Sequence, residues 1–483
     1  MRRRAIRVLL FALGTFLLMA GAAAAFIYWQ AEGIVGEFHA GAKTRVVESA
    51  RPELDVTPRR PVQTPAASSP KTSTVLLLGS DRRFGDPTRN SDTMVLVHLD
   101  RPEHRAALLS VPRDLYVTIP GHGHGRVNAA YGLGGPALVI RTLREALGVT
   151  INHFFDLNFG GFERVVNAMG GVYFPIDRRY FNHNVGTAGT NYANIDLLPG
   201  YQRLSGRQAL AFVRFRHTDS DRYRASRQQL FLLATMREAL GTHRYDVRRV
   251  RRLLRAFAKA TTSEVDGVRE LWGLVGAAHA AAAGHIRRYT LPTRDLTLYG
   301  ADYVTTSEDR IRSTVRAWLG DKRDASARRA RPVREAADAK TPVQLQPDPA
   351  AARQLLSATG QWVPCAPTAL PLGFFWPQRD GARSYRLAGH PAAALYATRG
   401  SGRSILWMWT TWQHAPILDS PTWKVTRGGR TYEVTVEAGR VRAVAWRIGE
   451  WRVWITNTLT DELSGRALLK LAGTCRPARK GPS

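Results

Sequence analysis

The sequence predicts an α/β domain with a central sheet, placed between an N-terminal membrane segment and a small β-rich module. Three observations predict this class. One long apolar run lies near the start, strand-like and helix-like runs alternate over residues 73–320, and tryptophan is concentrated near the end. Of the 483 residues, 44% are hydrophobic and 22% are charged, which is typical of globular domains rather than of a disordered chain. The formal net charge of +30 favours anionic partners.

The apolar run covers residues 8–29 and holds no charge. At 1.5 Å per residue it reaches about 33 Å, which is enough to cross a hydrocarbon core of about 30 Å. Four arginines precede it, so we expect residues 1–30 to be a cytoplasmic tip and a single-pass anchor in the cell membrane. A cleaved signal peptide is the alternative, since residues 22–25 are all alanine, although cleavable apolar regions are usually about 7–15 residues long. In both cases the chain after Trp29 is extracytoplasmic, where it meets lipid head groups and envelope polymers, and no nucleic acid partner is expected.

Residues 31–72 contain five prolines and few periodic apolar residues, which predicts a membrane-proximal stalk. The α/β domain follows at residues 73–320. Its predicted strands are residues 74–78, 93–99, 106–111, 149–158, 171–176 and 285–291. Its predicted helices are residues 136–147, 161–168, 205–213, 223–240, 247–261, 264–283 and 307–319. The order of the strands in the sheet cannot be read from these patterns.

Residues 321–353 are dense in Arg, Asp, Ala and Pro and predict a charged linker before a module at residues 354–483. This module contains nine of the twelve tryptophans, so we expect most of them to form its core, with stacking on sugars as the alternative. Alternating runs at residues 431–436 and 441–446 predict a hairpin, residues 451–455 a further strand, and residues 460–471 a terminal helix. The chain has two cysteines, Cys365 and Cys475. Outside the cytoplasm we expect them to pair, with two buried free thiols as the alternative.

Charged residues lie at the ends of the first three predicted strands of the domain. Asp81 follows the first strand after a glycine turn, Asp92 stands just before the second, and Arg113 and Asp114 follow the third. Ligands of open α/β sheets gather at the carboxyl ends of the strands. Two carboxylates there could hold one Mg²⁺, which takes few protein carboxylates and leaves the rest of its shell to water and phosphate. For each Asp alone, capping a turn or pairing with a neighbouring arginine is the alternative.

A second cluster is basic. Arg214 and Arg216 alternate around Phe215, so both guanidinium groups point the same way in an extended segment, and residues 224, 227 and 228 share one face of the predicted helix. Arginine binds phosphate in a bidentate manner. On its own, such a run is usually explained by a solvated basic helix face. Beside the candidate metal carboxylates, a diphosphate site is favoured.

The stretch from residue 74 to residue 229 resembles the LytR-CpsA-Psr family of cell-envelope ligases. The matching segments, in the family's order, are LLLGSD (76–81), RNSDTMVLV (89–97), SVPRDLYV (110–117), RVNAAYGLGG (126–135), INHFFDLNFGGF (151–162), MGGV (169–172), LSGRQALAFVRFRH (204–217) and DRYRASRQQ (221–229). The resemblance implies a layered α-β-α domain with a central mixed sheet. It also implies an enzyme that moves a glycopolymer from a polyprenyl-diphosphate carrier onto peptidoglycan through a phosphodiester bond and releases polyprenyl phosphate.

Site residues follow from the same resemblance. Asp81 and Asp92 are implied to hold Mg²⁺. The residues implied to bind the diphosphate are Arg89, Arg113, Arg214, Arg216, Arg224, Arg227 and Gln228. Arg113 would also stabilise the departing phosphate, and the general base would be a carboxylate, with Asp81, Asp92 and Asp221 as candidates. The family usually has a glycine where this chain has Tyr223, which leaves the local loop shape open.

Other functions would use the same site. A hydrolase would transfer the phosphoryl group of the polyprenyl-diphosphate glycan to water, and a non-catalytic polyprenyl-phosphate binder would regulate envelope synthesis. Specific binding of DNA is disfavoured by the predicted membrane anchor.

Overall fold

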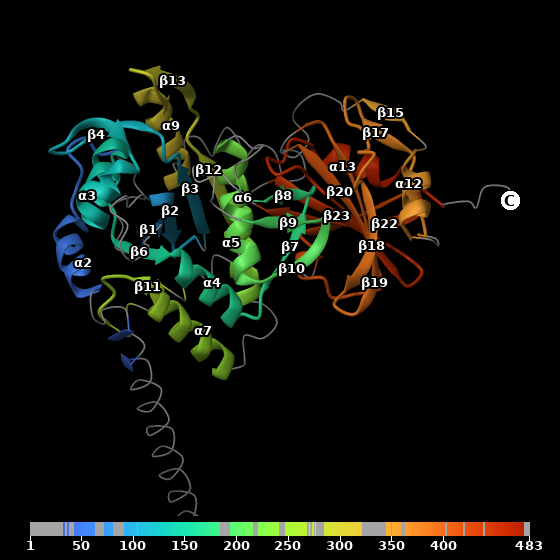
Figure 1. The fold of residues 1–483 in the computed structure, drawn as a ribbon, viewed down its shortest axis with the longest axis horizontal. Helices are drawn as coiled ribbons and strands as arrows, with labels where there is room; N and C mark the ends of the chain where they lie inside the picture. The colour runs from blue at the N-terminus through green and yellow to red at the C-terminus, as the bar shows by residue number, and fades with distance from the viewer. Residues whose placement is uncertain are drawn as a thin grey trace, which may run out of the picture.

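The computed structural model has an α/β domain followed by a β-rich C-terminal domain (Figure 1). The structure describes residues 32–33, 36–37, 43–62, 72–80, 91–103, 105–183, 194–215, 221–240, 247–267, 270, 273–274, 276, 285–320, 344–348, 350–359, 363–400, 403–418, 421–437 and 440–477. Within these ranges, no helix combines the length and the apolar character needed to cross a membrane. The predicted anchor at residues 8–29 lies outside the described residues.

A six-stranded mixed sheet forms the centre of the first domain, with the strand order β11-β6-β1-β2-β3-β12. Its strands are β1 (Thr72–Ser80), β2 (Ser91–Asp100), β3 (Arg105–Val111), β6 (His153–Asn158), β11 (Thr261–Thr262) and β12 (His285–Thr290). Strand β2 runs antiparallel to both β1 and β3, whereas β6 is parallel to β1 and β12 is parallel to β3. The predicted mixed central sheet is therefore confirmed.

Helices cover both faces of this sheet. They are α3 (Ala129–Leu147) and α9 (Glu308–Leu319) on one face, and α6 (Asp221–Leu240) and α7 (Val247–Ala260) on the other. Successive side chains of a strand point to opposite faces. In β1, Leu76 and Leu78 therefore join the core with α3 and α9, while Val75 joins the core with α7. Leu233 of α6 packs in a further cluster with residues of β2 and β3. The layers are α-β-α, as the sequence predicts.

An aromatic cluster lies beside the sheet, under helices α4 (Phe159–Ala168) and α5 (Gly206–Arg214). Small two-stranded sheets border it, formed by β7 (Val172–Ile176) with β10 (Gly200–Leu204) and by β8 (Tyr180–Asn182) with β9 (Ile195–Leu197). Ser205 starts α5 with a capping box, because its hydroxyl accepts the Gln208 N–H and the Gln208 side chain accepts the Ser205 N–H. This cap fixes where α5 begins, and Arg214 is the last residue of the helix.

Residues 43–62 fall in the stretch expected to be a stalk, and they pack against the first domain. Helix α2 (Lys43–Ala50) and the 3₁₀ turn η1 (Arg51–Glu53) lie beside α3, and Ala50 and Val62 are buried in the same core as α3. Arg144 of α3 donates to the Glu53 carboxylate at 2.9 Å. The domain thus includes the end of the stretch that precedes residue 73.

The C-terminal domain contains a seven-stranded antiparallel sheet with the order β18-β19-β20-β24-β23-β22-β21. The strands are β18 (Ala382–Leu387), β19 (His390–Thr398), β20 (Ser404–Thr410), β21 (Trp423–Arg427), β22 (Arg430–Glu437), β23 (Arg440–Ile448) and β24 (Trp451–Thr456). Helices α12 (Ala350–Thr359) and α13 (Gly465–Ala472) cover one face, where Trp407, Trp409 and Trp446 are buried. The other face packs on the first domain around Tyr201. Most of the described tryptophans of this domain are thus core residues, as expected.

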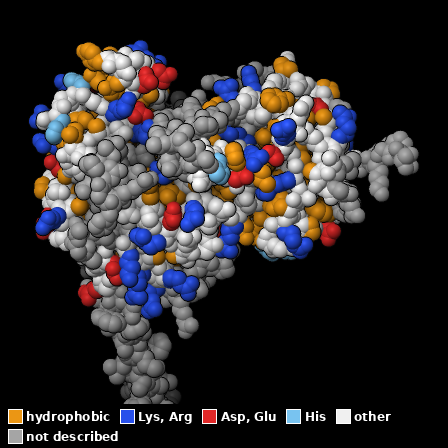
Figure 2. Space-filling view, viewed as in Figure 1, with side chains coloured by type: hydrophobic (Ala, Val, Ile, Leu, Met, Phe, Trp, Pro, Cys, Tyr) orange, Lys and Arg blue, Asp and Glu red, His pale blue; other side chains and the backbone are white. Residues whose placement is uncertain are grey.

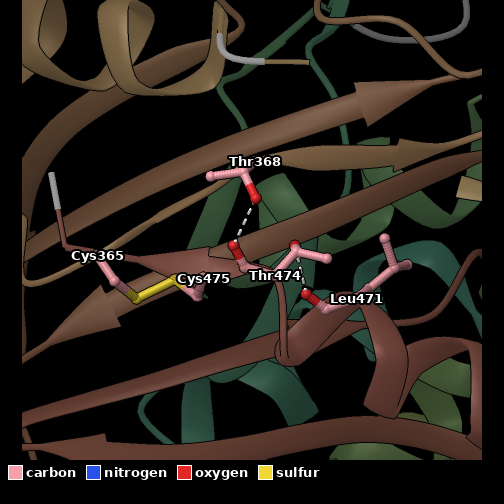
Figure 3. The surroundings of a disulfide bond; sticks show 5 residues. All are labelled: Cys365, Thr368, Leu471, Thr474 and Cys475. Atoms are coloured by element: carbon pink, nitrogen blue, oxygen red, sulfur yellow. Dashed lines mark hydrogen bonds between the residues drawn. A yellow bond between two sulfur atoms is a disulfide. The ribbon is translucent and has the colours of Figure 1, made fainter. Parts of the chain in front are cut away.

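A disulfide joins Cys365 and Cys475, whose Cα atoms are 5.3 Å apart (Figure 3). It connects β16 (Ala366–Pro367) with β25 (Cys475–Arg476), which follows α13, and both cysteines are buried. The Thr368 hydroxyl donates to the Thr474 carbonyl at 2.9 Å beside it. The expected pairing of the two cysteines is therefore present.

Several predicted elements differ from the observed ones. The strand predicted at residues 149–158 begins only at His153, and the terminal helix begins at Gly465 because the Ser464 side chain caps it by accepting the Ala467 N–H. Of the helix predicted at residues 264–283, residues 264–267 are not helical, residues 270, 273, 274 and 276 are helical, and the rest lies outside the described residues. The sequence did not predict the hairpins β4 (Tyr116–Ile119) with β5 (Gly123–Arg126) and β13 (Arg294–Leu298) with β14 (Ala301–Thr305). It also missed β15 (Leu345–Pro347), which pairs with β17 (Ala369–Pro371).

Candidate active site

The ends of four central strands meet at one edge of the sheet. Ser80, the last residue of β1, lies opposite Ser91 of β2 and opposite Asn158 of β6. Val111, the last residue of β3, lies opposite Met94 of β2. The carboxyl ends of β1, β3 and β6 and the start of β2 therefore share this edge, where ligands of such sheets gather.

The predicted site residues divide into three groups in the structure. Asp81, Arg89 and Arg216 lie outside the described residues. Asp92 and Asp221 have described backbones, in β2 and at the start of α6, but their side chains lie outside the description. The side chains that the structure places are those of Arg113, Arg214, Arg224, Arg227 and Gln228.

Arg113 lies two residues beyond β3, at the shared edge. Its Nε donates to the Asp114 carboxylate at 3.2 Å, and the other oxygen of that carboxylate lies 3.6 Å from Nε of Arg126. The Arg113 carbonyl also accepts the N–H of Asn128, directly before α3, at 3.1 Å. Asp114 therefore pairs with its neighbouring arginines, as the alternative for a single Asp anticipated, and it holds Arg113 in place at the edge.

Arg214 lies at the end of α5, and its guanidinium carbon is 4.0 Å from the centroid of the Phe159 ring. Phe159 is the first residue of α4, directly after β6, and Asn158 caps this helix by accepting the Gly161 N–H at 2.7 Å. A guanidinium over an aromatic face is attracted by the ring quadrupole. This contact therefore holds Arg214 at the carboxyl end of β6.

Helix α6 carries the remaining predicted residues. Arg224 is 6% exposed, whereas Arg227 is fully buried. The Arg227 guanidinium lies 5.3 Å from the centroids of both the Tyr180 and Phe212 rings, and it donates to the Phe215 carbonyl. The prediction that Arg227 contacts the diphosphate is therefore corrected, because a fully buried guanidinium offers no surface to a ligand. Its role is to hold the segment that leads into Arg216.

Gln228 acts on the same segment, since its Nε2 donates to the Val213 carbonyl at 3.3 Å. The next residue, Gln229, ties α6 to the sheet. Its Nε2 donates to the Ser110 hydroxyl at 2.8 Å and to the Tyr289 carbonyl at 2.9 Å. Helix α6 is thus fixed to β3 and β12 at the edge where the arginines gather.

A buried carboxylate at the same edge was not predicted. Asp156 of β6 is 3% exposed and accepts hydrogen bonds from the Ser80 hydroxyl at 2.8 Å and from the Tyr131 hydroxyl at 2.7 Å. It thereby connects β6, the end of β1 and the start of α3. A carboxylate between Phe155 and Leu157 of a predicted strand was the available signal, because buried charges are normally paired.

A pocket of about 230 Å³ lies between α2 and the first half of α3. Its lining residues are Arg45, Val46, Ser49, Tyr131, Gly132, Leu133, Gly134, Gly135 and Pro136. Helix α3 is kinked here, and Gly135 has φ of 63°, a value that favours glycine. Because Tyr131 both lines this pocket and donates to Asp156, the pocket adjoins the carboxylate at the sheet edge.

One group of described residues has the composition of a metal site, and it lies away from this edge. Nδ1 of His153, at the opposite end of β6, is 2.9 Å from the Glu264 carboxylate and 3.2 Å from that of Glu270. Burial alone would lower the pKa of His153, but the hydrogen bond that its ring donates to Glu264 and the two negative charges of Glu264 and Glu270 raise it. A histidine held between two carboxylates accounts for this group.

Lys and Arg side chains also gather over α7 (Figure 2). Arg251, Arg252 and Lys259 are exposed there, and Lys259 pairs with Glu37 at 3.6 Å. The apolar residues of the helix, such as Phe257 and Ala258, face the sheet. This surface is distinct from the strand edge that holds Arg113 and Arg214.

Comparisons with known proteins place similarity over the first domain. The sequence profile of the LytR_cpsA_psr family matches residues 39–318. The polyisoprenyl-teichoic acid–peptidoglycan teichoic acid transferase TagU of Oceanobacillus iheyensis is 38% identical over 173 residues, which is 34% of this chain and 51% of TagU. TagT of Bacillus subtilis, which has the same description as TagU, is 39% identical over 166 residues. These residues are 33% of this chain and 50% of TagT. The chain thus spans about half the length of these curated relatives.

A solved structure of TagT bound to LI-WTA is 26% identical in sequence, with a TM-score of 0.42. The similarity covers 55% of this chain and 99% of that one.

Proposed function

Since the chain belongs to the LytR_cpsA_psr family, we propose that it is a membrane-anchored, extracytoplasmic phosphotransferase. It moves a glycopolymer from a polyprenyl-diphosphate carrier onto peptidoglycan and releases polyprenyl phosphate. The observation that carries this proposal is the gathering of arginines at the one sheet edge where the carboxyl ends of β1, β3 and β6 meet. The transferase names of TagU and TagT support the same reaction class.

The diphosphate binds, in this proposal, to Arg113, Arg214, Arg224 and the half-buried Gln228, together with Arg89 and Arg216. Arg113 and Arg214 are partly buried and already oriented, by Asp114 and by the Phe159 ring. Donors that are fixed before the ligand arrives stabilise developing charge without further reorganisation. Arg227 and Gln228 donate hydrogen bonds to the carbonyls of Phe215 and Val213 and so fix the segment that contains Arg214.

Asp81 and Asp92 are proposed to hold Mg²⁺. In support, the residues before them, Ser80 and Ser91, lie opposite one another on neighbouring strands, and paired carboxylates beside a diphosphate are a suitable donor set for this ion. When bound there, Mg²⁺ would supply positive charge to the diphosphate.

The chemistry requires one bond to form and one to break. The oxygen of an acceptor hydroxyl on peptidoglycan attacks the phosphorus nearer the glycan, and the bond from this phosphorus to the bridging oxygen breaks. The electron pair leaves with polyprenyl phosphate, whose charge the arginines stabilise. The hydroxyl proton passes to a carboxylate, for which Asp81, Asp92 and Asp221 are the candidates. Phosphoryl transfer of this kind depends mainly on positioning and charge stabilisation.

The test uses the full chain in detergent micelles with a short synthetic prenyl-diphosphate glycan and peptidoglycan oligomers, with and without Mg²⁺. Mass spectrometry should detect a Mg²⁺-dependent phosphodiester adduct. The adduct should be lost in Arg113→Ala and kept in Arg294→Ala, which changes an exposed arginine of β13.

Other products would point to other functions. Free glycan phosphate without an adduct would identify a hydrolase. Retention of the lipid without any turnover would identify a binder. Loss of transfer in Asp81→Ala and Asp92→Ala with lipid binding preserved would favour the enzyme over the binder.

A further inference from the structure

A mostly buried segment of the C-terminal domain lies at the interface with the α/β domain. Residues 457–463 connect β24 to α13, and this domain follows the span of residues 39–318 that the family profile matches. Leu459 is fully buried in the aromatic cluster that also contains Phe212 and Phe215. The C-terminal domain therefore completes the core beneath the segment that Arg227 holds.

Asp461 anchors this segment to the central sheet. Its carboxylate pairs with Arg288 of β12 and with Arg442 of β23, the latter at 3.3 Å. Its backbone has φ of 52°, a value that non-glycine residues adopt at a cost and keep when their surroundings hold them. Arg442 adds hydrogen bonds to the carbonyls of Asn457 at 3.0 Å and Thr458 at 2.7 Å. The segment therefore has one fixed shape against β12.

The next residue, Glu462, is connected to α6 through Arg403. The Glu462 carboxylate lies 3.3 Å from Nε of Arg403, and this Nε donates to the Tyr223 hydroxyl at 2.9 Å. Tyr223 is in the first turn of α6 and directly precedes Arg224. In the last turn of α6, Arg237 pairs with Glu437 of the C-terminal domain.

Helix α6 is thus held at both ends by the C-terminal domain and in its middle by Gln229. It also lies between the two domains (Figure 1). We propose that the C-terminal domain positions α6 for diphosphate binding, with Arg403 and Glu462 as positioning residues that fix the turn bearing Arg224. The identity of the ligand rests on the proposed function, whereas the restraint on α6 does not. A binding group that is ordered beforehand loses less freedom when its ligand arrives.

The test uses the full chain and two variants that cut this contact, Tyr223→Phe and Arg403→Ala. Arg399→Ala is the matched control, because Arg399 is an exposed arginine on the same β19–β20 connection. Hydrogen exchange of peptides covering residues 221–229 is measured without ligand, and binding of farnesyl diphosphate is measured by calorimetry. Both variants should exchange faster in this turn and bind with a Kd raised about three- to tenfold, the effect of losing one hydrogen bond. Their thermal midpoints should stay near that of the wild type, since the ion pair and hydrogen bond of Arg403 are partly accessible to water, with a side chain 42% accessible.

Arg403→Lys should restore part of the affinity, because it keeps a charge that can reach Glu462. Unchanged exchange in both variants would overturn the inference, whatever the ligand is. Faster exchange with an unchanged Kd would also overturn it, because the restraint would then have no bearing on binding. If the wild type binds farnesyl diphosphate but transfers no glycan, the proposed function fails while the positioning inference stands. If the wild type does not bind farnesyl diphosphate, the claim that α6 is positioned for diphosphate binding is overturned, while the exchange result still decides whether Arg403 restrains α6.

Discussion

The buried carboxylate of Asp156 allows a quantitative prediction about the sheet edge. Tyr131 and Asp156 are each 3% exposed, so water does not replace their 2.7 Å hydrogen bond when it is lost. A hydrogen bond to a charged group contributes about 1.5–3 kcal/mol, and one between neutral groups about 0.5–1.5 kcal/mol. Tyr131→Phe should therefore lower local stability by about 1.5–3 kcal/mol in the wild type. The same change should cost about 0.5–1.5 kcal/mol when Asp156→Asn has already removed the charge.

The assay is native-state hydrogen exchange, read on peptides that cover β1 and β6, which meet at Ser80 and Asp156. It reports the local opening free energy and so does not require the two domains to unfold together. The difference between the two backgrounds is the coupling energy, expected to be about 1 kcal/mol or more. Tyr299→Phe is the control, because Tyr299 is fully exposed in the β13–β14 turn. Equal losses from Tyr131→Phe in both backgrounds would refute the argument that a charged acceptor holds this edge together.

Three further predictions concern other parts of the structure. Changing Cys365 and Cys475 to Ser should destabilise the C-terminal domain by up to about 4.7 kcal/mol, the chain-entropy value for a loop of about 100 residues; an unchanged urea midpoint would argue against this. His153 has a raised folded pKa, so the stability that its charge contributes is fully present below pH 6.5 and is lost as pH rises through the folded value. The difference in thermal midpoint between the wild type and His153→Gln should shrink accordingly, and a difference that is constant with pH would contradict the ion pair with Glu264. Arg227→Lys loses the planar contact with its aromatic neighbours and should cost about 1–3 kcal/mol in thermal unfolding, whereas a wild-type midpoint would show that the stacking contributes nothing.

Local patterns predicted β1, β2 and β3 well, because each is a short apolar run whose alternate residues face two helical layers. Strand β11 was not predicted, since its Thr261 falls in the helix predicted at residues 247–261. Leu76 and Val75 show the two directions within one strand. The order of the strands in the sheet could not be predicted, because neighbouring strands can be far apart in sequence. Strand β12, for example, pairs with β3, although most of the domain lies between them in the chain. The hairpin β4–β5 was missed because residues 121–125 are glycine and histidine in alternation and have no apolar period.

The sequence predicted which edge of the sheet holds the candidate site, but it did not predict the environment of each side chain there. Arg224 and Arg227 share a helix face, yet only Arg224 keeps any exposed surface, because three aromatic residues enclose Arg227. Helical spacing gives the direction of a side chain and says nothing about what a distant segment places over it. The contact from Arg403 to Tyr223 illustrates the same limit, since it joins residues 180 positions apart.

Several arginines are buried, so the net charge of +30 overstates the positive charge that an anionic partner can reach. Arg144 and Arg442 are 5% and 2% exposed, and each satisfies its guanidinium with carboxylates and carbonyls inside one domain. Arg227 is enclosed by aromatic rings and donates to the Phe215 carbonyl. Burying a charge is costly unless it is paired, so these residues stabilise the fold and are unavailable to an anionic partner. The charge that can meet a ligand is therefore smaller than the composition implies. What marks Arg113 and Arg214 as candidates is a partly exposed guanidinium, already oriented, at the carboxyl ends of the strands.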